Sequence, residues 1–200
     1  MASIVSALRA FKGYFKLKKA LANSPKLQIV VGASGVFEDN WIPTDIHTLN
    51  LLKPNSWKLF FKENSIAAIL AEHVWEHLTP EAGSIAAKTC YRYLKNGGYV
   101  RVAVPDGYHP KQEYINYVRP GGTGAGADDH KILYNYKTLS KAFEDAGFQV
   151  KMLEHFDENG KFHFSDWEKK DGMVHRSMRF DERNTNNELN YTSLIIDAIK

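Results

Sequence analysis

Residues 65–78 read SIAAILAEHVWEHL, and this stretch decides the fold. Its apolar run, residues 66–71, is rich in Ile and Leu and is typical of a fully buried central strand. The run ends at four side chains that can carry protons, ligate metal or bind substrate: Glu72, His73, Glu76 and His77. In an open parallel sheet, ligands bind beyond the carboxyl ends of the strands. The polar cluster therefore stands where such a sheet would hold its ligand.

The chain after this cluster completes a strand–helix–strand unit. Thr79 is suited to cap a helix, and Pro80 fits the first helical turn. We expect this helix to reach Leu94 and to stop at the glycines of residues 96–98. A strand is predicted over residues 99–104, and a helix between two strands favours parallel pairing of those strands.

A second ligand-binding element is predicted near the start of the chain. A strand over residues 27–31 runs into the small-residue turn GASG (32–35), which lets backbone N–H groups approach a ligand. A short strand over residues 41–46 carries Asp45 near its end, where a carboxylate commonly binds ribose hydroxyls. The interval between the two is too short for the helix whose N-terminus would anchor a pyrophosphate. The spacing therefore favours a ligand with a ribose and no phosphate.

Weaker patterns complete the order of elements. Residues 107–131 have little periodicity and contain the run GGTGAG, so we expect a mobile loop that ends near His130. The elements expected after this loop are a helix over 136–146, a strand over 149–154, a hairpin to 161–164, a polar loop over 176–190 and a last strand over 192–199.

Composition fits one domain without a membrane span. The chain has 200 residues, 44% of them hydrophobic, and its net charge of +3 does not call for a nucleic-acid partner. The single cysteine, Cys90, excludes an intrachain disulfide framework and fits a reducing compartment. No apolar run approaches the ~20 residues that span a bilayer, and lysines interrupt any signal-peptide core. We therefore expect a cytoplasmic protein.

Residues 1–24 are expected to form a basic amphipathic helix in front of a domain over residues 25–200. Apolar residues recur at helical spacing, and all the charged residues of this segment are basic. Either the helix docks on the domain with its basic face in solvent, or it makes weak contact with an acidic membrane surface.

Taken together, these patterns resemble the class I S-adenosylmethionine-dependent methyltransferases, in particular a small bacterial branch of the type 11 kind. The resemblance covers residues 27–200 and rests on motifs in a fixed order: VVGASG, WIPTDI, NSIAAILAEHVWEHL, LKNGGYVRVAVPD, DHKILY, KAFEDAGF and SLIIDAIK. It implies a three-layer, Rossmann-like α/β fold with a seven-stranded, mostly parallel sheet, an antiparallel last strand and a first-turn helix that is shortened or missing. It also implies an enzyme that transfers a methyl group from S-adenosylmethionine and releases S-adenosylhomocysteine.

Carried over by position, the resemblance assigns cofactor contacts. The residues expected to bind the cofactor are Gly32, Ala33, Ser34, Gly35, Asp45, Ile46, Asn55, Ala71, Glu72 and His73. Asp45 would accept from the ribose hydroxyls, Ile46 would pack on the adenine, and Asn55 stands where many relatives have an Asp that meets the adenine amino group. We expect no metal ligands in the site.

The sequence defines the residues that act on the methyl acceptor less clearly than those that bind the cofactor. Methyl transfer from a sulfonium needs a positioned acceptor and removal of its proton. Histidine suits proton removal near neutral pH, so His73 and His130 are the candidate bases, with Glu76 and His77 behind them. Equally, Glu72, Glu76 and His77 could form a hydrogen-bonded strut, and His130 could close a lid. The expected acceptor is a small molecule or a glycan-like compound.

Two other functions fit part of the sequence. His73, Glu76 and His77 match H-x-x-E-H, the inverted zinc-protease pattern, which requires both histidines on one helix. Pro80 begins a new helix directly afterwards, which disfavours that arrangement. The departure of VVGASG and Asn55 from the family pattern also allows a methyltransferase-like domain that binds ligands without catalysis.

Overall fold

A computed structural model describes residues 13–15, 17–24, 26–33, 37–185 and 188–200. These residues form a seven-stranded sheet in the order β2-β1-β3-β4-β7-β5-β6. The strands are β1 (Gln28–Val30), β2 (Ile42–Pro43), β3 (Ile66–Glu72), β4 (Leu94–Pro105), β5 (Gln149–Phe156), β6 (Phe162–Phe164) and β7 (Ser193–Ile199). Strands β1 to β4 pair in parallel, whereas β7 is antiparallel to β4 and β5, and β6 is antiparallel to β5. The predicted mostly parallel sheet with an antiparallel last strand is confirmed.

Strand β3 is the buried centre of this sheet, as its apolar run predicts. Residues Ile66 to Ala71 are all buried, and β1 and β4 flank the strand in parallel register. Alternate side chains point to opposite faces, so Ile69 joins the core on one face and Leu70 the core on the other. The strand ends at Glu72, where the polar cluster begins.

Helix α3 (Pro80–Tyr93) begins as predicted and ends earlier. The Thr79 hydroxyl accepts the Ala82 N–H at 3.3 Å and caps the helix. The helix ends at Tyr93 with Leu94 as its C-cap, one residue short of the predicted end. The prediction that the glycines stop the helix is wrong, because Leu94 already pairs with β3 and residues 95–98 bulge out of β4. Gly97 has φ +72°, and a Cβ on Gly98 would lie 2.9 Å from the Lys95 carbonyl oxygen, so the glycines serve this bulge.

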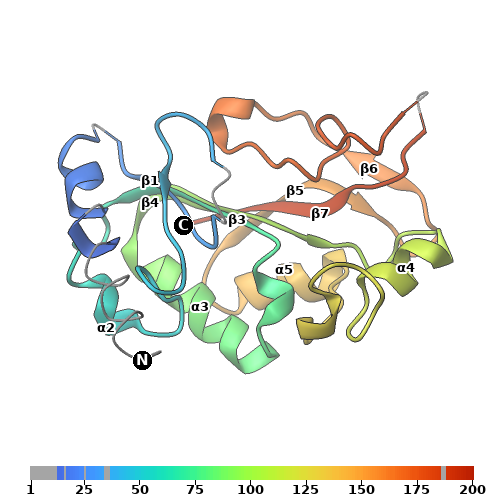
Figure 1. Cartoon of the computed structure of the whole chain (residues 1–200), viewed down its shortest axis with the longest axis horizontal. Helices are drawn as coiled ribbons and strands as arrows, with labels where there is room; N and C mark the ends of the chain where they lie inside the picture. Colours follow the sequence, from blue (N-terminus) through green and yellow to red (C-terminus); the bar gives the residue numbers. More distant parts are fainter. Residues whose placement is uncertain (1–12, 16, 25, 34–36, 186–187) are drawn as a thin grey trace, which may run out of the picture.

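The helices cover one face of the sheet. The α-helices with described bounds are α2 (Pro54–Trp57), α3, α4 (Gln112–Val118) and α5 (Tyr136–Glu144), and the 3₁₀ turns are η1 (Trp75–His77), η2 (Ala127–Asp129) and η3 (Lys169–Asp171). Figure 1 shows α3 and α5 side by side below the sheet. Trp75 packs on Phe143 of α5 with ring centres 5.1 Å apart, so η1 lies in this helical layer.

The other face is covered by residues 165–185 and 188–192, here called the covering segment, and these described residues contain one 3₁₀ turn and no α-helix (Figure 1). This segment is held by buried charged groups. Arg101 of β4 is 2% exposed, pairs with Asp197 at 2.8 Å and donates to the Gly172 carbonyl at 2.7 Å. The buried Glu154 carboxylate accepts hydrogen bonds from the Trp167 indole and the Thr192 hydroxyl. The third layer is therefore an irregular segment fixed by polar contacts.

Residues 107–131 are more ordered in secondary structure than their pattern predicts. They contain α4 and η2, and Tyr114 and Val118 of α4 pack against Tyr191. The glycine run forms tight turns, with the Gly124 N–H donating to the Tyr117 carbonyl at 2.8 Å. The sequence pattern misses α4, because its two buried residues, Tyr114 and Val118, are one helical turn apart and form no longer repeat. The prediction that residues 107–131 are mobile is not tested.

The predicted N-terminal helix is described only in part. Residues 13–15 and 17–22 are helical, and Leu17 belongs to the core beneath the helical face. Residues 1–12 and 16 lie outside the described residues, so the prediction of a membrane contact through this helix is not tested. Within the described ranges, no helix has the length and apolar character needed to cross a bilayer.

Candidate functional site

A cavity of about 400 Å³ opens at the carboxyl ends of the central strands. The chain passes from β1 to β2 on one side and then to β3 on the other side of β1, so the order of strands reverses at this point. Val31 and Ala33 line the cavity from the end of β1, and Leu70 and His73 line it from the end of β3. Such a switch point is where open α/β sheets bind ligands.

The turn after β1 approaches the cavity as predicted. Gly32 and Ala33 both line it. Gly32 has φ +65°, and a Cβ at this position would lie 2.7 Å from the Val74 side chain. Both facts require glycine here. Ser34 and Gly35, the other two residues predicted from this turn, lie outside the described residues.

The residues predicted to bind ribose and adenine do not line this cavity. Asp45 and Asn55 are exposed, and Ile46 is 68% exposed. The Asp45 Oδ1 atom accepts the N–H groups of His47 and Thr48 at 2.8 and 3.0 Å, which fixes the orientation of the carboxylate. None of the hydrogen bonds among the described residues uses Asp45 Oδ2. The carboxylate is thus preset, with one oxygen available at the end of β2.

Ala71 was expected beside the cofactor, but its side chain is fully buried in the core of the helical face. Glu72, the next residue, lines the cavity, and its carboxylate is already engaged. It accepts the backbone N–H groups of His175 at 3.0 Å and Arg176 at 2.8 Å. Glu72 therefore joins the tip of β3 to the covering segment, as the strut interpretation of this residue predicts.

His73 is held by a partner at each ring nitrogen. Its Nδ1 atom lies 2.9 Å from Glu76 Oε1, and its Nε2 atom lies 3.0 Å from the Ser193 hydroxyl. A carboxylate only accepts, so Nδ1 carries the proton of the neutral ring, and Nε2 accepts from Ser193. Nε2 is therefore the atom of His73 that can accept a proton. The backbone of His73 has φ +54°, a left-handed conformation that turns the chain out of β3.

Glu76 is a buried carboxylate with incomplete partners. It is 1% exposed, and neither of its oxygens has a hydrogen-bond donor in good alignment among the described residues. The 2.9 Å approach of His73 Nδ1 is close, but its hydrogen-bond geometry is poor. Burial raises the pKa of Glu76, and the neighbouring His73 more than offsets this, so the pKa is lowered. Glu76 is thus a buried negative charge that faces the cavity.

His77 and His130 stand together beside Glu76. Their ring centres are 4.8 Å apart with nearly perpendicular planes. His130 is 9% exposed, and its Nδ1 atom lies 2.7 Å from the Val118 carbonyl oxygen, so Nδ1 is the donor and Nε2 keeps a lone pair. His77 Nδ1 lies 3.3 Å from Asp129 Oδ2. The structure therefore brings together all four residues predicted for catalysis.

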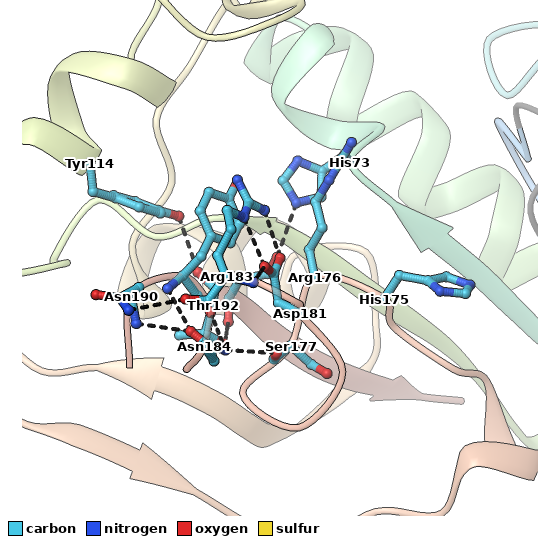
Figure 2. A network of polar contacts seen from close by, with 12 residues as sticks. His73, Tyr114, His175, Arg176, Ser177, Asp181, Arg183, Asn184, Asn190 and Thr192 are labelled. Atoms are coloured by element: carbon cyan, nitrogen blue, oxygen red, sulfur yellow. Dashed lines mark hydrogen bonds and ion pairs between the residues drawn. The ribbon is translucent and has the colours of Figure 1, made fainter. Parts of the chain in front are cut away.

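The far wall of the cavity comes from residues that sequence patterns did not single out. Arg176, Arg183 and Tyr191 line it from the irregular segment and the residues before β7. The Arg183 guanidinium lies 3.4 Å from the centre of the Tyr191 ring and pairs with Asp181 at 2.6 Å. Figure 2 shows Arg176 and Arg183 extending toward His73, with His175 pointing away from them. The wall therefore carries two arginines, of which Arg183 is paired with Asp181.

Asn184 fixes the shape of this wall. Its amide donates to the Ser177 and Tyr191 carbonyls, and its oxygen accepts the Asn190 and Tyr191 N–H groups (Figure 2). These bonds close the segment between residues 177 and 191 into a compact loop. The only sequence signal for this wall is a polar stretch that contains several arginines.

The geometry contradicts the zinc-protease interpretation of H-x-x-E-H. That mechanism needs His73 and His77 one turn apart on an α-helix. Here β3 ends at Glu72, His73 has a left-handed backbone, and η1 contains only Trp75–His77. The two histidines contact different partners and are not on one helix.

Comparisons with known proteins identify the fold. No family model and no curated protein matches this chain. Among solved structures, an S-adenosylmethionine-dependent methyltransferase from Archaeoglobus fulgidus is similar, with TM-score 0.50 and 18% identity over 100% of this chain and 95% of that chain. A second, from Thermotoga maritima, has TM-score 0.48 and 14% identity over 98% of this chain and 96% of that chain. The chain therefore has the Rossmann-like fold of the class I S-adenosylmethionine-dependent methyltransferases.

Proposed function

We propose that this protein transfers a methyl group from S-adenosylmethionine to an acceptor bound in the cavity. The observation that carries the proposal is the position of the cavity, at the switch point between the ends of β1 and β3. The glycine turn of β1 and the polar cluster of β3 meet there, and they do so on the fold that these enzymes use.

In this proposal the cofactor lies along the ends of β2, β1 and β3. The methionine part runs over Gly32 and Ala33, and Ser34 and Gly35, which follow them in the sequence, are proposed as further contacts. The free Oδ2 atom of Asp45 accepts from the ribose, because the carboxylate is already oriented by its own turn. The exposed Ile46 gains an apolar partner when it covers the adenine, and Asn55 meets the adenine edge. The sulfonium end then points past Glu72 toward His73.

His73 is proposed to be the base. The acceptor nucleophile attacks the methyl carbon, the carbon–sulfur electron pair passes to sulfur, and the acceptor proton passes to His73 Nε2 in place of the Ser193 hydrogen bond. The Glu76 carboxylate lies 2.9 Å from Nδ1, where its charge favours this orientation of the ring and stabilises the imidazolium that forms. Glu76 is thus a positioning residue. His77 and His130 line the cavity next to Glu76.

The acceptor is proposed to be a small, polar molecule, including glycan-like compounds. A cavity of about 400 Å³ holds a small molecule and not a folded chain. Arg176 gives it hydrogen-bond donors, and the exposed ring of Tyr117 offers a flat surface. An acceptor with hydroxyl or anionic groups on a ring fits this lining.

Calorimetry with S-adenosylmethionine tests the cofactor part of this proposal. Wild-type protein should bind one equivalent, and Asp45→Asn should bind at least about tenfold more weakly, because it loses a charge-assisted hydrogen bond. The matched control is Asp39→Asn, an exposed acid outside the cavity. Absence of binding at millimolar cofactor refutes the proposal. Binding without turnover against a broad panel of small acceptors would instead support a ligand-binding module that lacks catalysis.

A further inference from the structure

We propose that Glu76, His77 and His130 bind a divalent transition-metal ion of the Zn²⁺ class at the edge of the cavity. One ligand atom from each residue lies within 4.8 Å of the other two. Two imidazoles and a carboxylate are a donor set that binds such ions and leaves a coordination position open. This proposal replaces the expectation, drawn from sequence, of a site without metal ligands.

The strongest independent observation is Glu76. Its carboxylate is almost fully buried, and Oε2 has no donor among the described residues. A buried carboxylate without partners is costly, and coordination to a cation removes this cost. His73 approaches Oε1, so Oε2 is the oxygen left for the ion. In the proposed methyl transfer only Oε1 of Glu76 has a role, beside His73, and a metal ion gives Oε2 a partner as well.

His130 has the orientation of a metal ligand. Its Nδ1–H group is held by the Val118 carbonyl at 2.7 Å, which fixes the tautomer and leaves the Nε2 lone pair unused. Metal-bound histidines usually have this kind of support, in which one ring nitrogen donates to a carbonyl or carboxylate and the other binds the ion. His77 is less constrained, because its Nδ1 atom lies 3.3 Å from Asp129 Oδ2 but makes no well-aligned hydrogen bond among the described residues.

The three ligand atoms must move slightly closer together to bind one ion. Around a tetrahedral ion with bonds of ~2.0–2.1 Å, ligand atoms lie about 3.3 Å apart, whereas the farthest pair here is within 4.8 Å. Rotation of the half-exposed His77 side chain can supply this difference, because its side chain is 32% exposed and the other two are held by the core. The open coordination position then faces the cavity, which all three residues line.

Metal titration of the full chain tests this proposal without any enzymatic assay. Protein stripped with a chelator should bind one Zn²⁺ per chain in competition with a chromophoric indicator, and Co²⁺ should give the visible bands of a tetrahedral site. Glu76→Gln and His130→Ala should each weaken binding at least about tenfold. The control His175→Ala removes a histidine from the same cavity and should bind as wild type does.

Each outcome decides the proposal. Stoichiometric binding that falls in the cluster variants and persists in the control supports it. Absence of binding to the wild type at about 1 mM Zn²⁺ overturns it, and so does a loss in the control equal to that in the cluster variants. If Glu76→Gln melts with loss of structure, His77→Ala carries the test, because this side chain is half-exposed and its truncation leaves the core intact.

Discussion

The two hydrogen bonds that join Glu72 to the covering segment, here called the Glu72 bracket, predict how fast the backbone amides of that segment exchange. The Glu72 carboxylate accepts two backbone N–H groups, from His175 and Arg176, more than 100 residues away in the chain. Glu72→Gln keeps the size of the side chain but offers a single acceptor oxygen. Its amide group then faces one of the two N–H donors, so that hydrogen bond is lost and a donor meets a donor.

The cost follows from the type of bond. A hydrogen bond to a charged group contributes about 1.5–3 kcal/mol, and one to a neutral group about 0.5–1.5 kcal/mol. Arg176 is exposed, so the lower end of each range applies: the bond removed costs about 1.5 kcal/mol and the bond that becomes neutral weakens by about 1 kcal/mol. Local opening of residues 173–176 should therefore become easier by roughly 2.5 kcal/mol. Since every 1.4 kcal/mol is a factor of ten, the amides of His175 and Arg176 should exchange about 30 to 100 times faster.

Hydrogen exchange read by mass spectrometry or NMR measures this directly. The control is Glu168→Gln, which neutralises an exposed acid of the same covering segment. Glu72→Gln should speed amide exchange over residues 173–176 and leave exchange in α3 and α5 unchanged, whereas Glu168→Gln should exchange as wild type does. Equal protection of His175 and Arg176 in Glu72→Gln and wild type would refute the bracket and return Glu72 to the role of a free cofactor contact.

The remaining predictions concern the fold and its pH dependence. Burial raises the pKa of Asp106 to about 6. The folded state therefore binds this proton more tightly than the unfolded state does, and the stability linked to it is complete below pH ~4 and is lost as the pH rises through about 6. Asp106→Asn should accordingly gain about 3 kcal/mol relative to wild type between pH 4 and 7 in denaturant titrations; a constant difference across this range contradicts the shift. Arg101→Met leaves the Asp197 carboxylate without its partner in a largely buried site and should cost about 3–5 kcal/mol of unfolding free energy, most of it regained in Arg101→Met with Asp197→Leu; a double variant no more stable than the single one contradicts the pairing. Thr79→Ala removes the α3 cap and should cost about 1 kcal/mol by thermal unfolding, whereas an unchanged melting temperature would show that the 3.3 Å contact does not cap the helix.

Local signals in the sequence predict the central sheet well. The apolar run of β3, the Thr79-Pro80 helix start and the small-residue turn after β1 each act within a few residues of chain. Such signals need no knowledge of distant partners. The structure confirms the first two, and it describes Gly32 and Ala33 of the third. Boundaries are less predictable, because Gly97 and Gly98 serve a strand bulge as readily as a helix end.

The walls of the site could not be predicted in the same way. Arg176 and Arg183 line the cavity because contacts across long stretches of chain bring them there, such as the hydrogen bond from the Arg176 N–H to Glu72. Asn184 shapes this wall through five hydrogen bonds to backbone groups in a segment without periodicity. Polar loops of this kind carry no repeating pattern, so their geometry follows only from the folded molecule.

The roles of the polar cluster also depend on tertiary contacts. From sequence, Glu72, Glu76 and His77 could be catalytic residues or struts. The structure separates Glu72, which binds backbone groups, from Glu76, which is buried beside His73 with an oxygen unused. The two glutamates differ because the left-handed backbone of His73 turns the chain after β3, so their side chains point to different partners.

If the switch point between β1 and β3 holds the cofactor, a crystal structure of the protein with S-adenosylhomocysteine will show the ligand there. We expect density that runs from the Asp45 carboxylate over Gly32 to the space between Glu72 and His73. Crystals grown at saturating ligand with that space unfilled, or with the ligand in the separate hollow beside Trp41 and Lys170, would contradict the account.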